Sequence, residues 1–183
     1  MSKPDVGKSK FLSLVLRHQP ERIGVQLDEN GWIEVDTLLS AMAAHGKEVS
    51  REELDRLVLE NDKQRFAFSE DGSRIRANQG HSVEVDLALQ AQEPPESLFH
   101  GTVEKFLPAI FQEGLQKRER HHVHLSPSLE TAIKVGRRRG KPIVLEIASG
   151  PMHRDGHAFF VSGNGVWLVD QVPPQYLTQL EKP

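Results

Sequence analysis

Residues 65–77, RFAFSEDGSRIRA, alternate apolar and polar side chains on both sides of the turn EDGS at 70–73. Alternation with a period of two around such a turn predicts a β-hairpin. The apolar residues of this hairpin would face a core, which leaves Arg65, Arg74 and Arg76 on the opposite face. Two interpretations of that face stay open, an ordinary solvent-facing strand pair and a basic surface that contacts a ligand.

Three helices are predicted before the hairpin, over residues 9–18, 35–46 and 50–61. Each has apolar residues at helical spacing and a polar residue at its start. The candidate N-caps are Ser9, Asp36 and Ser50, the last in a capping box with Glu53. Three helices followed by a hairpin are typical of a winged-helix module.

The stretch AQEPPES at 91–97 combines adjacent prolines with acidic residues and is the best candidate for a domain boundary. We therefore divide the chain into residues 1–92 and 93–183. The second part has strand patterns at 97–102, 122–126, 142–148 and 165–172 and helix patterns at 104–115 and 128–140. Because strands and helices do not alternate regularly, the predicted fold class is α+β rather than a nucleotide-binding parallel sheet.

Composition excludes several classes of protein. The chain has no cysteine, which rules out disulfides, thiolate metal sites and a cysteine nucleophile. No apolar run approaches the roughly 18 residues of a membrane helix, and no apolar signal segment begins the chain, so we expect a cytoplasmic protein. The charge is uneven: residues 117–141 carry eight basic and two acidic side chains, although the net charge of the chain is −3. A solvated basic face and an anion-binding surface both fit this window.

Three of the nine histidines lie in ERHHVHLS, residues 119–126. On a strand, alternation would place Arg120, His122 and His124 on one face, opposite Val123 and Leu125. Two histidines at this spacing hold a metal firmly only with a third ligand, so we expect no metal site and favour a structural role for His122.

Phosphate chemistry offers another interpretation of this basic segment. Guanidinium groups that converge bind phosphate, and an imidazole moves protons or donates hydrogen bonds near neutral pH. The chain offers Arg17 and His18 at a helix end, Arg65 on the hairpin and Arg120 beside the histidines. Sequence alone does not bring these four residues together.

Eight short motifs follow one another along nearly the whole chain: LRHQPERIG at 16–24, DENGW at 28–32, RF at 65–66, IRANQGHS at 75–82, HGT at 100–102, RHHVHLS at 120–126, VGRRRGKP at 135–142 and NGVWL at 164–168. In this order and at these spacings the chain resembles the NAD-dependent RNA 2′-phosphotransferase family, the tRNA-splicing phosphotransferases and their bacterial relatives.

The resemblance implies a winged-helix, RNA-binding lobe over residues 1–92 and an ADP-ribosyltransferase-like, NAD-binding lobe over 93–183, with the active site between them. The family's catalytic Arg-His-Arg-Arg set falls on Arg17, His18, Arg65 and Arg120. The residues implied for NAD binding are His100, Gly101, Thr102, His124, Ser126, Val166 and one of Arg137, Arg138 and Arg139, of which Arg138 is favoured. For His81 and Ser82, in the family's motif between the lobes, structural and RNA-binding roles both stay open.

The implied reaction has two steps. The RNA 2′-phosphate first attacks C1″ of NAD and expels nicotinamide, which leaves an ADP-ribosylated RNA phosphate. The ribose O2″ then attacks that phosphorus and releases 2′-hydroxyl RNA and ADP-ribose 1″,2″-cyclic phosphate. The expected partners are therefore a 2′-phosphorylated, tRNA-like RNA and NAD, which is consumed, without a metal or a membrane, and the expected protein is a monomer.

Two other functions stay open at this stage. One is an ADP-ribosyltransferase that acts on phosphorylated RNA or DNA ends and stops after the first step. The other is a winged-helix regulator that senses NAD without consuming it.

Overall fold

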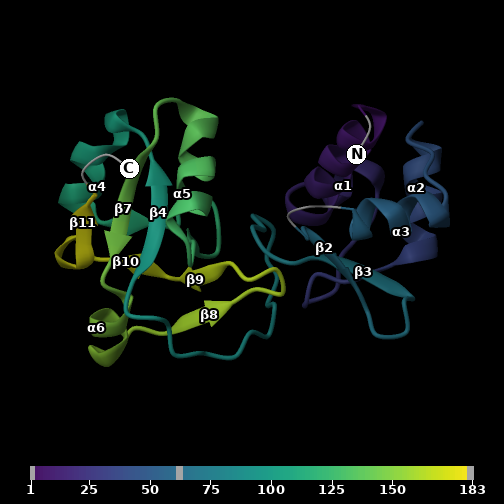
Figure 1. The fold of residues 1–183 in the computed structure, drawn as a ribbon. Helices are drawn as coiled ribbons and strands as arrows, with labels where there is room; N and C mark the ends of the chain where they lie inside the picture. The colour runs from purple at the N-terminus through teal and green to yellow at the C-terminus, as the bar shows by residue number, and fades with distance from the viewer. Residues whose placement is uncertain (1–2, 61–63, 181–183) are drawn as a thin grey trace. The chain divides into compact units, whose positions relative to one another are not determined.

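The computed structural model describes residues 3–60 and 64–180 and contains both helices and antiparallel sheets, which confirms the α+β class (Figure 1). By its internal contacts the chain divides into two compact units, Met1–Ala88 and Leu89–Pro183. The division falls four residues before the position chosen from the sequence, which lay between residues 92 and 93.

The first unit begins with three α-helices, α1 (Lys3–Arg17), α2 (Val35–Ala44) and α3 (Arg51–Leu59), with a 3₁₀ turn η1 (Pro20–Ile23) after α1. Their apolar stripes meet in one core, in which Leu12, Leu16, Leu38 and Leu54 have no exposed surface. The three predicted helices are therefore present, and the core that they form holds the end of α1 in place.

Two of their predicted starts need correction, and the third is confirmed. Helix α1 begins at Lys3 rather than at Ser9, which is buried in mid-helix, because Asp5 in the first turn forms an ion pair with Arg56 of α3 at 3.1 Å. Helix α2 has Glu34 and not Asp36 as its N-cap. Ser50 does cap α3, since its Oγ accepts from the backbone N–H of Glu53.

The reciprocal half of that predicted capping box is replaced by a longer-range contact. The carboxylate of Glu53 accepts a hydrogen bond from Nζ of Lys8 in α1 at 2.6 Å. The Glu53 side chain, which the capping-box pattern assigned to the start of α3, thus forms an ion pair with α1 instead.

The predicted hairpin is confirmed as β2 (Phe66–Phe68) and β3 (Arg74–Ala77), which pair antiparallel. Phe66 lies opposite Ala77 and Phe68 opposite Ile75, so the apolar residues share the core face as alternation requires. A short strand that the sequence did not predict, β1 (Ile33–Glu34), pairs with the other edge of β3. The segment before it, DENGW, is the predicted turn, closed by hydrogen bonds from the N–H groups of Asn30 and Trp32 to Oδ1 of Asp28.

The described residues of the second unit form three small antiparallel sheets. One consists of β11 (Leu177–Gln179), β7 (Ile143–Ile147) and β4 (Leu98–Thr102), and another of β6 (Val123–Leu125), β9 (Trp167–Val169) and β8 (Phe159–Val161). The third pairs β10 (Gln171–Val172) with β5 (Leu115–Gln116). A bridge between Phe99 and Ser126 joins β4 to the end of β6, which brings two of the sequence motifs side by side.

Three helices complete this unit: α4 (Leu107–Glu113), α5 (Leu129–Gly136) and α6 (Ser149–Arg154). The sequence predicted α4 and α5, together with the end of α4 at Gly114, but it missed α6, β5, β8 and β11. Over the part of the chain that is described, no helix is long and apolar enough to cross a membrane.

Strand β4 and helix α5 approach each other so closely that only glycine fits at position 101. A Cβ built on Gly101 would lie 1.8 Å from the backbone oxygen of Ala132 and 2.8 Å from the backbone nitrogen of Gly136. Gly101 therefore has a packing role, whatever it contributes to a ligand site. The contact fixes the strand that carries His100 against the helix that leads to the three consecutive arginines.

Candidate functional site

The end of α1 is the first of two candidate sites. The backbone oxygen of Arg17 accepts hydrogen bonds from the N–H groups of Ser82 at 2.8 Å and Val83 at 3.3 Å. The last turn of a helix leaves backbone carbonyl groups without hydrogen-bond donors, and here the segment after the hairpin provides two N–H donors. The Arg17 side chain turns toward the hairpin, where Nη2 donates to the backbone oxygen of Arg65 at 3.4 Å.

His18 directly follows this helix and is exposed to solvent. Its backbone N–H still bonds to the oxygen of Leu14 at 2.9 Å, so the residue continues the helical course. Nδ1 of its ring lies 2.8 Å from Oγ of Ser82. The same serine therefore caps the helix with its backbone and orients the imidazole with its hydroxyl group, which favours the structural one of the two roles left open for it.

Arg65 lies at the open end of the hairpin, where its backbone oxygen also accepts from the N–H of Asn78 at 2.9 Å. The structure thus brings together three of the four predicted catalytic residues. We call Arg17, His18 and Arg65, with Ser82, the helix-end cluster. The cluster joins the Arg17 guanidinium to the backbone of Arg65 beside an oriented imidazole, and guanidinium groups suit an anionic oxygen ligand.

The fourth predicted catalytic residue, Arg120, belongs to the second unit and anchors the second candidate site. It lies in the turn before β6, not on the strand itself as alternation required. Its Nη1 is 2.9 Å from Nδ1 of His124. Because a guanidinium group only donates, Nδ1 of His124 accepts, and a neutral His124 carries its proton on Nε2.

His100 lies beside this pair. Its Nδ1 is 3.0 Å from the backbone oxygen of His124, a contact that follows from the bridge between β4 and β6. Burial lowers the pKa of His100 below the ordinary value, the His124 carbonyl opposes the shift, and the charges of Arg139 and Arg120 add to it. His100 is therefore a neutral imidazole near pH 7.

The 3₁₀ turn η3 (Arg137–Arg139) after α5 brings further positive charge to this place. Burial lowers the pKa of Arg120, and the charges of Arg139 and Arg138 lower it further, as expected for neighbouring cations. We call Arg120, Arg138 and Arg139 the arginine cluster. Within residues 3–60 and 64–180, no carboxylate forms an ion pair with any of its members.

The sequence left Arg137, Arg138 and Arg139 as candidates for one NAD contact and favoured Arg138. In the structure the charge of Arg139 acts on both Arg120 and His100. Arg139 also stacks over the ring of Phe106 at 5.7 Å. The signal in the sequence was the run of three arginines itself, but only the structure of the turn η3 shows which of them lie close to Arg120 and His100.

The remaining residues predicted to bind NAD make backbone contacts within the second unit. Thr102 ends β4 opposite Ile143, and Ser126 exchanges both backbone hydrogen bonds with Phe99. Val166 precedes β9 and donates its N–H to Oγ of Ser162 at 3.1 Å. These contacts explain why the residues are ordered, and their part in binding a ligand stays a prediction.

One more histidine of the segment 119–126 contacts an aromatic ring. His122 packs against Phe160 with ring centroids 5.6 Å apart. Among the described residues, no three histidine or acidic side chains are grouped so that they could hold a metal ion.

Comparison with known proteins places this arrangement in a family. A family model described as "RNA 2'-phosphotransferase, Tpt1 / KptA family" matches residues 3–171, which include every residue of both candidate sites. The chain belongs to this family.

Individual relatives agree with the family assignment. A protein of Streptomyces griseus named "Probable RNA 2'-phosphotransferase" is 58% identical over 176 residues, with 92% of this chain and 93% of the relative covered. Proteins of the same name from Rhodopirellula baltica and Hahella chejuensis are 58% and 52% identical and cover 94% and 99% of this chain, and 95% and 97% of their own lengths. The similarity therefore extends across both units, as the resemblance in eight motifs required.

Proposed function

We propose that this phosphotransferase removes a 2′-phosphate from RNA by transferring it to the ADP-ribose part of NAD. Membership of the RNA 2′-phosphotransferase family supports an enzyme that acts on that phosphate. The observation that carries the proposal is the helix-end cluster, in which Arg17 is bound to Arg65 and His18 is fixed by Ser82. Because these residues come from separate segments of the first unit, the fold has to assemble them.

The chemistry assigned to these residues follows from the charge of the substrate. A phosphate monoester carries nearly two negative charges at neutral pH, and the guanidinium groups of Arg17 and Arg65 would hold its oxygens and offset charge that shifts during transfer. The family resemblance gives Arg120 a role in the same chemistry. His18 would donate a hydrogen bond or move a proton at the sugar hydroxyl in the second step, since an imidazole changes its protonation near neutral pH. An already anionic nucleophile needs no general base for the first step.

We place NAD in the second unit. When bound, NAD supplies the ribose carbon that accepts the phosphate as nicotinamide leaves. Arg138 and Arg139 of the arginine cluster fit the pyrophosphate of such a ligand, because no described carboxylate neutralises their positive charges. The neutral His100 donates from Nδ1 to the His124 carbonyl, so its Nε2 would accept a hydrogen bond from the ligand without adding charge next to these arginines.

We further propose that the first unit is a winged-helix domain and the second an ADP-ribosyltransferase-like domain. The order of α1, α2 and α3 before the hairpin supports the first assignment. The position of the His-Gly-Thr motif on β4, bridged to the strand of His124, supports the second.

Substitution of single arginines tests the proposed roles. Arg65→Ala and Arg120→Ala should retain binding of NAD, measured by calorimetry, but lose RNA dephosphorylation by at least about a hundredfold. Arg22→Ala is a matched control, because Arg22 is exposed on η1 and its described contact is only to Gln19. A fully active Arg65→Ala enzyme would refute the assignment of the helix-end cluster.

The products formed by the unmodified protein distinguish this reaction from the other two functions. If the unmodified protein accumulates ADP-ribosylated nucleic acid and releases no phosphate product, the reaction stops after the first step. If it binds duplex DNA and never releases nicotinamide, the protein is a regulator.

A further inference from the structure

The face of the hairpin opposite the core carries a line of arginines. Ala67 lies opposite Arg76, and Arg65 precedes Ala67 by two residues, so that Arg65 and Arg76 are diagonal neighbours on one face. Arg74 follows on the same face, two residues from Arg76 along β3. A row of three guanidinium side chains therefore starts at Arg65 of the helix-end cluster and runs toward the hairpin turn.

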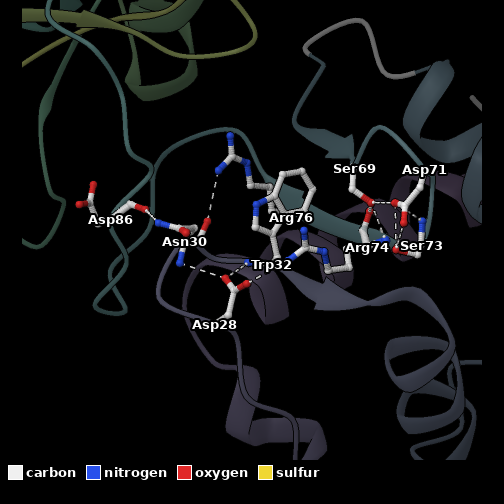
Figure 2. Close-up of polar contacts among 9 residues, drawn as sticks. All are labelled: Asp28, Asn30, Trp32, Ser69, Asp71, Ser73, Arg74, Arg76 and Asp86. Carbon is white, nitrogen blue, oxygen red and sulfur yellow. Dashed lines mark hydrogen bonds and ion pairs between the residues drawn. The ribbon is translucent and has the colours of Figure 1, made fainter.

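Trp32 holds the two outer arginines of this row. The guanidinium carbons of Arg76 and Arg74 lie 4.4 Å and 5.5 Å from the centre of its indole ring, within the range of a cation–π contact. Figure 2 shows both side chains beside the Trp32 ring. Because a stacked guanidinium has lost most of its rotational freedom, both groups are ordered before any ligand arrives.

Only weak polar contacts compete for these two arginines. Nη1 of Arg74 lies 3.5 Å from Oδ2 of Asp28, and Nη1 of Arg76 lies 3.4 Å from the backbone oxygen of Asn30. Both distances are at the long limit of a hydrogen bond. Nε of Arg76 is buried, but the Nη donors of both groups have no strong competing acceptor among the described residues.

The row has a definite end. Beyond Arg74, the hairpin turn carries the acidic residues Glu70 and Asp71, which line a shallow hollow with Ser69 and Arg74. Hydrogen bonds from Ser69 and Ser73 lower the pKa of Asp71 to about 2, so this carboxylate is charged at neutral pH. A polyanion that follows the arginines from Arg65 would be repelled at this point.

We propose that Arg76 and Arg74, held against Trp32, bind the phosphate backbone of the substrate RNA on one side of the 2′-phosphorylated nucleotide. The inference rests on the proposed function, because it extends the strand outward from a phosphate held at Arg65. Two ordered guanidinium groups in line recognise successive phosphates of a single strand without reading its bases. The surface adds affinity for longer RNA and is not required for the chemical step.

The test compares two substrates that carry one internal 2′-phosphate, a dinucleotide and an oligonucleotide extended by several nucleotides on both sides. The variants are Arg74→Gln with Arg76→Gln, each single substitution, and Trp32→Leu. Arg51→Gln is the matched control, because Arg51 also stacks on a ring of the hairpin, Phe68 at 5.0 Å, but extends from helix α3. Thermal unfolding establishes that each variant is folded.

We expect the double substitution to lower the ratio of kcat/KM for the longer RNA to that for the dinucleotide roughly tenfold. The slope of log affinity against log salt for the longer RNA, measured by fluorescence anisotropy, should become less steep by about 1.4, and each single substitution should account for about half. Trp32→Leu should weaken binding with a smaller change in slope, since both charges remain. Arg51→Gln should retain the ratio and the slope of the unmodified protein.

An unchanged ratio and slope in the folded double variant would overturn the inference, as would an equal loss on both substrates. If the unmodified protein converts neither RNA but the double substitution still reduces the salt slope, the inference about RNA binding stands and the proposed reaction fails. Conversion of both RNAs by every variant at an unchanged ratio would leave the reaction standing and refute this surface.

Discussion

Replacement of Gly101 by alanine tests whether the packing of β4 against α5 determines the stability of the second unit. The added Cβ would lie 1.8 Å from the backbone oxygen of Ala132, 2.8 Å from its carbonyl carbon and 2.8 Å from the nitrogen of Gly136. All three are backbone atoms, so no side-chain rotation relieves the overlap and the helix must shift. Overpacking of this kind costs about 3 kcal/mol, the upper end of the usual range.

The two tryptophans allow each unit to be followed by itself, because Trp32 lies in the first unit and Trp167 in the second. In a Trp32→Phe background, the fluorescence of Trp167 reports the second unit alone. A loss of about 3 kcal/mol in a domain of this size lowers Tm by roughly 12 °C or more. The expected result for Gly101→Ala is therefore a large decrease in the Trp167 transition.

Gly7→Ala in a Trp167→Phe background is the matched control. A Cβ on Gly7 meets nothing within 4 Å, and the residue lies inside helix α1, so alanine should stabilise the first unit by about 0.5 to 1 kcal/mol. A Gly101→Ala protein whose Trp167 transition stays within about 2 °C of its parent would refute the packing argument.

Two further predictions concern the histidines of the candidate sites. Ser82→Ala removes the hydroxyl contact of 2.8 Å to His18 but leaves the backbone cap of α1, so kcat should decrease about fivefold. Ser82→Thr should restore kcat, and a change in KM alone would contradict the positioning role. Burial lowers the pKa of His100 and of His122 below 6.5, so the unfolded chain binds more protons than the folded chain below that pH. The urea midpoint of the Trp167 transition should therefore be constant above pH 6.5 and decrease on acidification, with a smaller decrease in His122→Gln. A midpoint independent of pH would contradict this.

Local patterns predicted the elements that depend on neighbouring residues. The alternation in RFAFSEDGSRIRA and its turn residues are local signals, and β2 and β3 formed where they indicated. Helix starts were predicted less well, because distant side chains determine them. Lys8 takes the carboxylate of Glu53, and the first turn of α1 is held by an ion pair of Asp5 to Arg56, contacts that span about 45 to 51 residues of sequence.

In the candidate sites too, the residue types could be predicted from the sequence, whereas contacts between distant residues could not. The resemblance supplied the residue types, and Arg17, His18 and Arg65 do lie in one cluster. Sequence did not show that Ser82 orients His18, because 64 positions separate the two residues. Nor did it show that Arg139 lies close to Arg120 and His100, since the turn η3 and the bridge between β4 and β6 create that proximity.

The most direct test of the account is a product analysis. Purified protein is mixed with NAD, EDTA and a short RNA that carries one internal 2′-phosphate, and mass spectrometry follows both the RNA and the nucleotides. The account predicts loss of the RNA phosphate together with nicotinamide and ADP-ribose 1″,2″-cyclic phosphate in equal amounts. Unchanged RNA in the presence of folded protein that binds NAD would contradict it.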